Sequence, residues 1–292
     1  MAIRFDRSLE PHYGVAERLS PRIQRLLAPN PGPFTFRGTG VYIVGGGAEV
    51  AVIDPGPDLS EHLQALKRAL DGRRVSHILI THTHKDHSPA AGPLKAWSGA
   101  PTYGFGPHLQ TDDVEEGGDR LFVPDVTVQD GAIIAGRDFT FTCVHTPGHT
   151  ANHLCFALAE EQALFCGDHV MGWSTSVVAP PDGNMGDYMR SLEKLIARKD
   201  GILYPTHGSP IAEPAPFLRA YLTHRRLRAA QIASCIRRGA DTVPAIVSRL
   251  YADVAPALHK AAALTVRAHL EHLMEEGRVV ALADGRYAVT PS

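Results

Sequence analysis

Four side chains of metal-binding type lie within six positions of one another, in the segment His82-x-His84-x-Asp86-His87. Imidazole nitrogens and carboxylate oxygens are ligands that suit zinc and its first-row neighbours. A single histidine is more often a surface or core residue, but four ligand types in six positions favour a metal site. A loop can fold such side chains around one point, and alternating positions can serve two neighbouring metals.

Three further candidate ligands stand much later in the chain, each at the end of an apolar stretch that is typical of a strand. They occur in the segments HTPGHT, CGDH and PTHG. Strand ends that face a common edge often build functional sites, so these groups can converge on the histidine cluster. The predicted metal ligands are His82, His84, Asp86, His87, His149, Asp168 and His207.

Paired metals predict hydrolytic chemistry for this site. Two divalent ions roughly 3.5–4 Å apart polarise a substrate oxygen and lower the pKa of a shared water towards about 7. The hydroxide produced in this way is a nucleophile at neutral pH. Asp86 is the candidate catalytic residue, because a carboxylate there can orient the nucleophile and shuttle a proton.

The local sequence predicts which elements position the first cluster. Residues 41–54 indicate a hairpin around a Gly-rich turn, and a helix is expected after Ser60 as its N-cap. The run VSHILI, residues 75–80, is typical of a buried strand that ends at THTHKDH. Ser88 and Pro89 then suit the N-cap and first position of a second helix running towards Trp97.

Later segments continue the alternation of strands and helices. FTFTCVHTPG, HLCFALAE, ALFCGD and GILYPTHG are expected to form strands, and Asp187 to Ala197 an amphipathic helix. The Pro-rich segment 208–217 predicts a boundary between a catalytic domain, residues 1–208, and a second domain, residues 209–292. In the second domain we expect helices over 218–238, 244–251 and 256–276, then a terminal hairpin turning at Asp284-Gly285, an arrangement typical of a winged helix.

Composition limits the remaining possibilities. With 292 residues and 44% hydrophobic content, the chain can bury a sizeable core, and a net charge of −2 predicts no global basic field. No stretch is long and apolar enough for a membrane span, so no membrane partner and a cytoplasmic location are expected. The cysteines are expected to be buried thiols; they are Cys143, Cys155, Cys166 and Cys235.

The segment THTHKDH resembles the T-H-x-H-x-D-H signature of the metallo-β-lactamase superfamily, and residues 41–208 follow its order of elements. The resemblance implies an α+β class protein, with an αββα sandwich followed by the winged-helix-like domain. It also implies that His82, His84 and His149 hold one metal, that Asp86, His87 and His207 hold the other, and that Asp168 bridges them. Asp54 in IDPG would be structural. The di-iron relatives carry glutamate in place of His84, which favours zinc here, with manganese or iron as alternatives.

Segments such as GDHVMGWSTSVVAPPDG and HRRLRAAQI also resemble the β-lactamase-like protein 2 subgroup, which includes an endoribonuclease of single-stranded RNA. The leading expectation is a metal-dependent hydrolase of phosphodiesters in single-stranded RNA or of a related anionic substrate. A thioester, lactone or β-lactam hydrolase of glyoxalase II type is the alternative. A non-catalytic metal-binding scaffold is a third, which seven intact ligands oppose.

Two features of the C-terminal region bear on partners. The candidate recognition helix sets Arg267 against Glu271, Glu275 and Glu276, so duplex DNA is not an expected partner. The basic segment that begins at His224 either guides an anionic substrate or forms a solvated face with acidic neighbours, and the sequence leaves both open.

The sequence also leaves open whether Tyr188 and Trp173 line the site or fill the core. An exposed winged-helix face leaves a homodimer open.

Overall fold

The computed structural model describes residues 3–109 and 117–291, and its largest feature is a pair of β-sheets. The first sheet has seven strands in chain order, with antiparallel pairing as far as β4 and parallel pairing from β4 to β7. Its strands are β1 (Ala16–Arg18), β2 (Ile23–Leu27), β3 (Gly40–Val44), β4 (Glu49–Ile53), β5 (Arg74–Leu79), β6 (Thr102–Gly104) and β7 (Val126–Thr127).

The second sheet has five strands in the order β12-β11-β10-β9-β8. Its pairs are antiparallel except for the parallel pair β11–β12. Its strands are β8 (Ile133–Ala135), β9 (Thr140–His145), β10 (Leu154–Leu158), β11 (Ala163–Gly167) and β12 (Ile202–Pro205).

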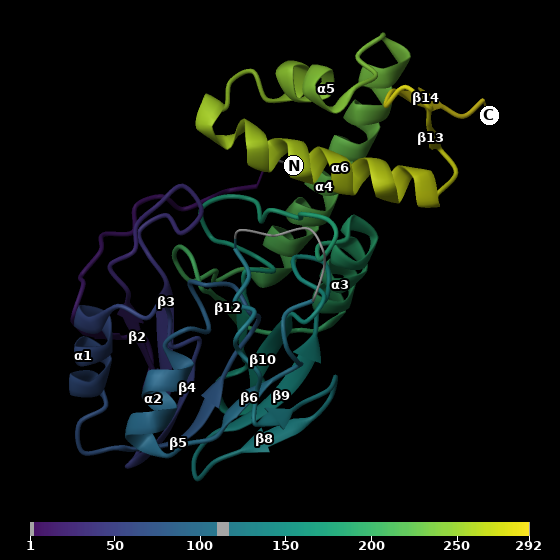
Figure 1. Ribbon diagram of the computed structural model, residues 1–292. Coiled ribbons are helices and arrows are strands. Elements are labelled where there is room, and N and C mark those ends of the chain that lie inside the picture. The colour runs from purple at the N-terminus through teal and green to yellow at the C-terminus, as the bar shows by residue number, and fades with distance from the viewer. Residues whose placement is uncertain (1–2, 110–116, 292) are drawn as a thin grey trace.

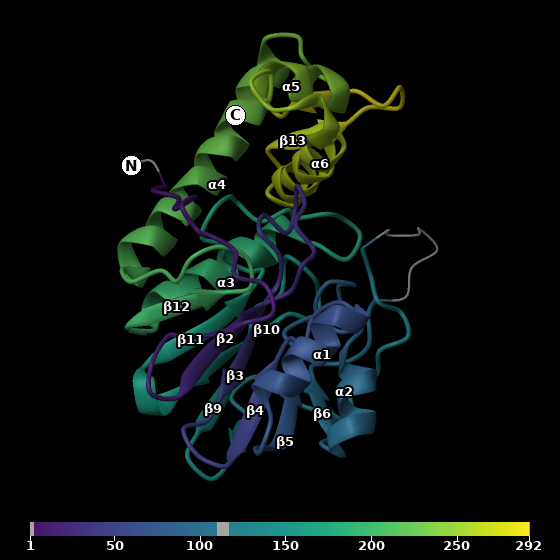
Figure 2. The ribbon, with the colours of Figure 1, turned by 90° about the vertical axis from the view of Figure 1, so that its left-hand side faces the viewer.

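Side chains that alternate along the strands pack the two sheets into a four-layer sandwich. On β3, Tyr42 and Val44 join the core between the sheets, whereas Val41 and Ile43 face the opposite way. There they pack with helices α1 (Ser60–Ala69) and α2 (Ala91–Ser98). The outer face of the second sheet is covered mainly by α3 (Met185–Ala197) and the start of α4 (Pro214–Arg237). Figure 2 shows the sheets between these two sets of helices.

The C-terminal region forms a separate cluster above the sandwich (Figure 1). It consists of the second half of α4, α5 (Val243–Leu250), a 3-10 turn (Pro256–Leu258) and α6 (His259–Glu275). The hairpin of β13 (Val279–Ala281) and β14 (Tyr287–Val289) closes it. The expected α+β class, αββα sandwich and winged-helix-like region are therefore confirmed, and the placement of the domain boundary stays a prediction.

Several helix starts differ from the expectation. Ser60 is the first residue of α1 and Leu59 its N-cap. The second helix begins at Ala91 rather than at Ser88-Pro89, because the Ser88 hydroxyl donates to Asp119 and does not cap the helix. The fourth begins at Pro214, inside the segment expected to break regular structure. Proline is compatible with a first helical turn, where no intrahelical N–H bond is needed.

Two expectations from composition can be checked in the described residues. All four cysteines are buried and free, as expected. Within residues 3–109 and 117–291, no helix combines the length and the apolar character that crossing a bilayer requires.

Candidate metal centre

Strand direction brings the scattered candidate ligands to one edge of the sandwich. β9 and β11 are each antiparallel to β10 and therefore run in the same direction, and β12 is parallel to β11. The carboxyl ends of these three strands share an edge, and His149, Asp168 and His207 follow them in the chain. The THTHKDH loop reaches the same place from β5 in the other sheet. Its Thr81 carbonyl accepts a hydrogen bond from the backbone of Leu154 at 2.7 Å.

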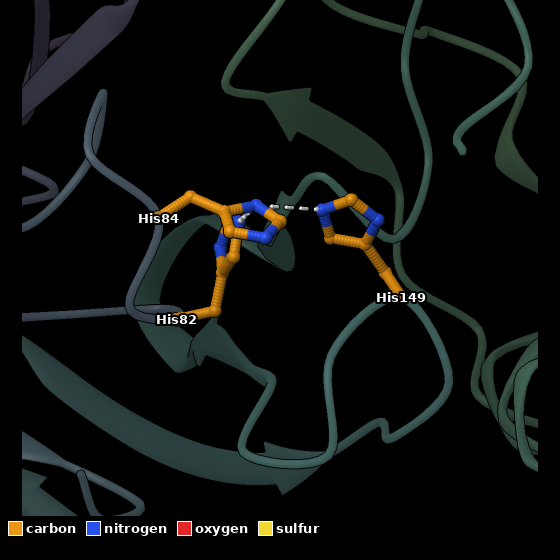
Figure 3. A group of neighbouring side chains, drawn as sticks. All are labelled: His82, His84 and His149. Carbon is orange, nitrogen blue, oxygen red and sulfur yellow. Dashed lines mark hydrogen bonds between the residues drawn. The ribbon is translucent and has the colours of Figure 1, made fainter. Parts of the chain in front are cut away.

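Three histidines from two of these loops face one another. The ring nitrogens of His82 and His84 are 2.9 Å apart, and those of His84 and His149 are 3.2 Å apart (Figure 3). One ligand atom from each of these side chains lies within 4.8 Å of the others. This spacing is compatible with three nitrogen ligands around one cation.

A second group lies beside the first and shares residues with it. Asp86, His87 and His207 again offer ligand atoms within 4.8 Å of one another, as do His82, His87 and Asp168. Asp168 Oδ2 is 3.4 Å from His207 Nε2 and 3.9 Å from His149 Nε2. Asp168 therefore lies between the two groups, where its carboxylate would be within reach of a cation held by either one. All seven predicted ligands are brought together.

Asp54 holds two residues of the THTHKDH loop by hydrogen bonds. One carboxylate oxygen accepts from the Thr81 backbone N–H at 2.8 Å, and the other accepts from the Thr81 hydroxyl at 2.7 Å. The second oxygen also lies 2.9 Å from His87 Nδ1. Donation from Nδ1 leaves the Nε2 lone pair of His87 directed towards Asp86 and Asp168, which agrees with the structural role that the resemblance implies for Asp54.

Burial and neighbouring charges divide the histidines into two classes. Burial and the nearby His84 lower the pKa of His149 to about 4, and burial with His87 lowers the pKa of His82 well below its usual value. For His207, burial opposes protonation, but the carboxylates of Asp168 and Asp86 raise its pKa to about 10. Neutral imidazole is the metal-binding form, so His82 and His149 are already in that form at neutral pH.

The donor set fits two divalent cations. His87 Nε2 and Asp168 Oδ1 are buried and have no hydrogen-bond partner, an arrangement that is costly unless a ligand occupies the space between them. Nitrogen and carboxylate oxygen are the donors found in binuclear zinc, iron and manganese sites. Divalent cations would also offset the negative charge of the two carboxylates, Asp86 and Asp168, that are held close together.

The structure also places the aromatic and basic side chains for which the sequence left two roles open. Tyr188, on the buried face of α3, is fully buried, so it fills the core and does not line the site. Trp173 is half-buried and stacks on Phe36, with ring centroids 4.8 Å apart. In the basic segment, Arg226 pairs with Glu193 and Arg225 is only 2% exposed. Arg225 therefore cannot contact an anionic substrate directly, whereas Arg226 stays 62% exposed beside Glu193.

Sequence reasoning missed residues that tie the loops of the site together. The Asn152 amide donates to Thr83 Oγ1 at 2.9 Å and also contacts the carbonyls of Gly106 and Pro107. His153 is fully buried, and its ring centroid is 5.1 Å from that of His82. An Asn-His pair before a strand is not distinctive, and only its nearness to HTPGHT could have drawn attention to it.

Comparison with known proteins gives matches along most of the chain. Residues 35–207 match the profile of the metallo-beta-lactamase superfamily, and residues 242–286 match that of the beta-lactamase associated winged helix domain. A "Beta-lactamase-like protein 2 homolog" from Caenorhabditis elegans is 33% identical over 92% of this chain and 89% of its own length. An "Atrochrysone carboxyl ACP thioesterase" from Claviceps purpurea is 32% identical over 83% of this chain and 76% of its own length.

Solved structures show the same fold. A metallo-beta-lactamase family protein from Thermus thermophilus aligns over 94% of this chain and all of its own, with a TM-score of 0.77 and 23% identity. A beta-lactamase domain protein from Burkholderia ambifaria aligns over 97% of this chain and 96% of its own, with a TM-score of 0.79 and 19% identity. Both alignments include the C-terminal helices as well as the sandwich.

Proposed function

Because this chain belongs to the metallo-beta-lactamase superfamily and is a metal-dependent hydrolase, we propose that it cleaves thioesters at a pair of zinc ions. The observation that carries the hydrolase part is the convergence of seven nitrogen and carboxylate donors, with ligand atoms within 4.8 Å in each group. The proposed sets are His82, His84 and His149 for one ion, and Asp86, His87 and His207 for the other, with Asp168 between them.

Asp86 is the proposed proton-transfer residue. Two bound cations would supply Lewis acidity and make hydroxide available at neutral pH. The Asp86 side chain is 26% exposed, compared with 10% for Asp168, so it is the more open of these two carboxylates to solvent and substrate. It accepts the proton as the water oxygen bonds to the thioester carbonyl carbon. The carbon–sulfur bond then breaks, and the thiolate leaves and takes up the proton.

Three curated relatives support a thioester substrate. Each is named as an atrochrysone carboxyl ACP thioesterase, is 30–32% identical to this chain, and aligns with 81–89% of it. In the basic segment, Arg225 is buried and does not contact substrate, whereas Arg226, Arg237 and Arg238 are exposed. This segment therefore does not discriminate between a nucleic acid and an anionic thioester such as acyl-coenzyme A.

Single-stranded RNA is the second candidate substrate. The segments that resemble the β-lactamase-like protein 2 subgroup support it, and a relative with that name is 33% identical over 92% of this chain. The same two-metal chemistry serves phosphoryl and carbonyl centres, so the fold alone does not choose between them.

The test compares three substrates with the zinc-loaded protein: an acyl-coenzyme A thioester, a single-stranded RNA oligonucleotide and nitrocefin. We expect turnover of the thioester, and a loss of about 100-fold or more in kcat for Asp86→Asn, which keeps the shape of the side chain but removes a carboxylate proposed both as general base and as metal ligand. Asp71→Asn, at an exposed turn, is the matched control and retains activity.

Each alternative result has a distinct reading. Cleavage of RNA alone replaces the thioester assignment with the second candidate. Binding of two metal equivalents without turnover of any substrate supports a non-catalytic scaffold. Elemental analysis that finds no metal after loading contradicts the metal centre itself.

A further inference from the structure

The loop that follows β11, residues 168–178, carries two groups of the proposed metal centre. Asp168 begins the loop, and near its end the main-chain carbonyl of Val177 accepts a hydrogen bond from His149 Nδ1 at 2.6 Å. This bond fixes the tautomer of His149 and leaves its Nε2 lone pair facing His84. The position of the Val177 carbonyl therefore determines the orientation of a ligand.

Helix α4 holds this loop through two side chains one turn apart. The Tyr221 hydroxyl accepts from the Met171 backbone N–H at 3.1 Å and donates to the Ser174 carbonyl at 2.5 Å. Four residues later, on the same face of the helix, the Arg225 guanidinium donates to the Ser176 carbonyl. The last of these bonds lies one residue before Val177.

Arg225 has an environment that a packing role does not explain. Its side chain is 2% exposed, and its guanidinium lies over the Tyr188 ring with the carbon atom 4.8 Å from the ring centroid. Among the residues that the structure describes, no ion pair involves Arg225, and its Nε has no hydrogen-bond partner. A buried charge without a carboxylate is costly, and an apolar side chain would fill this space at lower cost. What a guanidinium adds here is the bond to the loop.

We infer that Arg225, with Tyr221, is a positioning residue that orients the metal ligand His149 through the main chain of residues 174–177. The inference rests on the proposed metal centre and adds to it a link between the C-terminal helices and the group of three histidines. The other group does not use this link. His207 Nδ1 instead lies 3.1 Å from the carbonyl of Gly38, in the segment that leads into β3.

The inference predicts a selective effect on metal binding. In Arg225→Met, one of the two zinc equivalents should bind about 10–100-fold more weakly, the usual cost of losing a group that orients a ligand, while the other stays within about threefold. Arg225→Lys, which still carries a donor, should give an intermediate value. Chelator competition with the intact protein, together with metal content by mass spectrometry, measures both equivalents.

Arg228→Met is the matched control on the same helix. Arg228 lies three residues further on, over the Tyr251 ring and bonded to the Leu250 carbonyl in the C-terminal cluster. Both zinc affinities should stay within about threefold of the wild type in this variant. If Arg225→Met fails to fold, Tyr221→Phe removes only a hydroxyl and should weaken the same single equivalent.

A spectroscopic readout separates positioning from general stability. In nitrogen-15 histidine spectra of the metal-free wild type, His149 should appear as the Nδ1–H tautomer, and Arg225→Met should populate both tautomers. If both equivalents keep wild-type affinity, or if both weaken equally alongside a lower Tm, the inference is overturned while the hydrolase proposal stands. If the wild type takes up no metal, the proposed function fails first.

Discussion

At the scale of single residues, Asp54 shows how a side chain outside the proposed ligand set can position a proposed metal ligand. It has a φ of 47°, in the left-handed region that Asp and Asn tolerate better than other residues. From that position its carboxylate contacts both the backbone at Thr81 and the ring of His87. Asp54 thereby couples the shape of the THTHKDH loop to the direction of a ligand.

Replacing Asp54 by Asn tests this coupling, because Asn keeps the size and the backbone preference but removes a negative oxygen. We expect about 10–100-fold weaker zinc binding, since the ring of His87 loses an ionic partner. Chelator competition measures the change. Asp138→Asn is the control, because Asp138 bonds Gly46 at the opposite end of β9 and should leave the affinity unchanged.

A second residue-scale prediction concerns pH. His269 on α6 is fully buried, and burial, with the charges of Arg225 and Arg228, lowers its pKa well below 6.5; His272 and His224 also face it. Below pH 6.5, the unfolded chain therefore binds a proton at His269, whereas the folded chain does not. The free energy of unfolding falls as the pH drops, and this contribution is fully present only above pH 6.5.

The variant His269→Leu isolates this contribution from those of the other histidines. Between pH 6.5 and pH 5, its free energy of unfolding should fall less steeply than that of the wild type, by up to about 1.4 kcal/mol per pH unit. Urea unfolding at several pH values measures the slope. Identical slopes for the two proteins would contradict the assignment of a neutral, buried His269.

At the scale of elements, the site depends on how closely α3 approaches the loop before His149. Gly148 has a φ of +131°, and a Cβ atom there would lie 2.3 Å from both the backbone N and the Cα of Tyr188. The side-chain amide of Asn184 caps α3 by accepting from the Asp187 N–H, and the Asn184 backbone N–H donates to the Gly148 carbonyl. The first turn of α3 therefore packs directly on the main chain that carries a ligand.

The Gly148→Ala variant should be strongly destabilised, because the backbone conformation is strained for alanine and the new methyl group meets backbone atoms. The two costs together are about 2–6 kcal/mol in the free energy of unfolding. Gly131→Ala is the matched control. Its φ of +77° imposes a backbone cost of about 1–2 kcal/mol, but nothing lies within 4 Å of the added Cβ. Chemical denaturation should separate the two variants.

At the scale of the whole molecule, α4 is shared by two hydrophobic clusters. Leu218 and Tyr221 pack under the second sheet, whereas Ile232 and Ile236 belong to the C-terminal cluster. One continuous helix thus ties the winged-helix region to the sandwich. The predicted boundary after residue 208 separates the sandwich from side chains that complete its core.

A fragment of residues 1–208 should therefore lose cooperative unfolding and its near-ultraviolet circular dichroism, because its second sheet exposes the face that α4 covers. A fragment of residues 1–240 keeps α4 and should retain a cooperative transition at a lower Tm. Thermal unfolding of both fragments provides the comparison. A native-like 1–208 fragment would support independent folding of the predicted first domain.

The sequence by itself determined the parts of this protein that local chemistry encodes. Closely spaced residues of metal-binding type, such as His82, His84 and Asp86, indicate a metal site from sequence alone, because few structural roles need three donors so near one another. Strand and helix periodicity located most elements to within a few residues, and the αββα order followed from the resemblance. Helix starts were less accurate, because a serine such as Ser88 can donate to a distant carboxylate instead of capping.

Only the tertiary structure decided which distant groups meet. The shared direction of β9, β11 and β12 brings His149, Asp168 and His207, which lie in three separate loops, to the THTHKDH loop of the other sheet, which no single segment specifies. The burial of Arg225 is also a tertiary property. The sequence around Arg225 is typical of a basic surface helix, yet the packing of α4 against residues 168–178 places the charge of Arg225 inside the protein. Local sequence fixes the type of side chain, whereas long-range packing fixes its partners and its exposure to solvent.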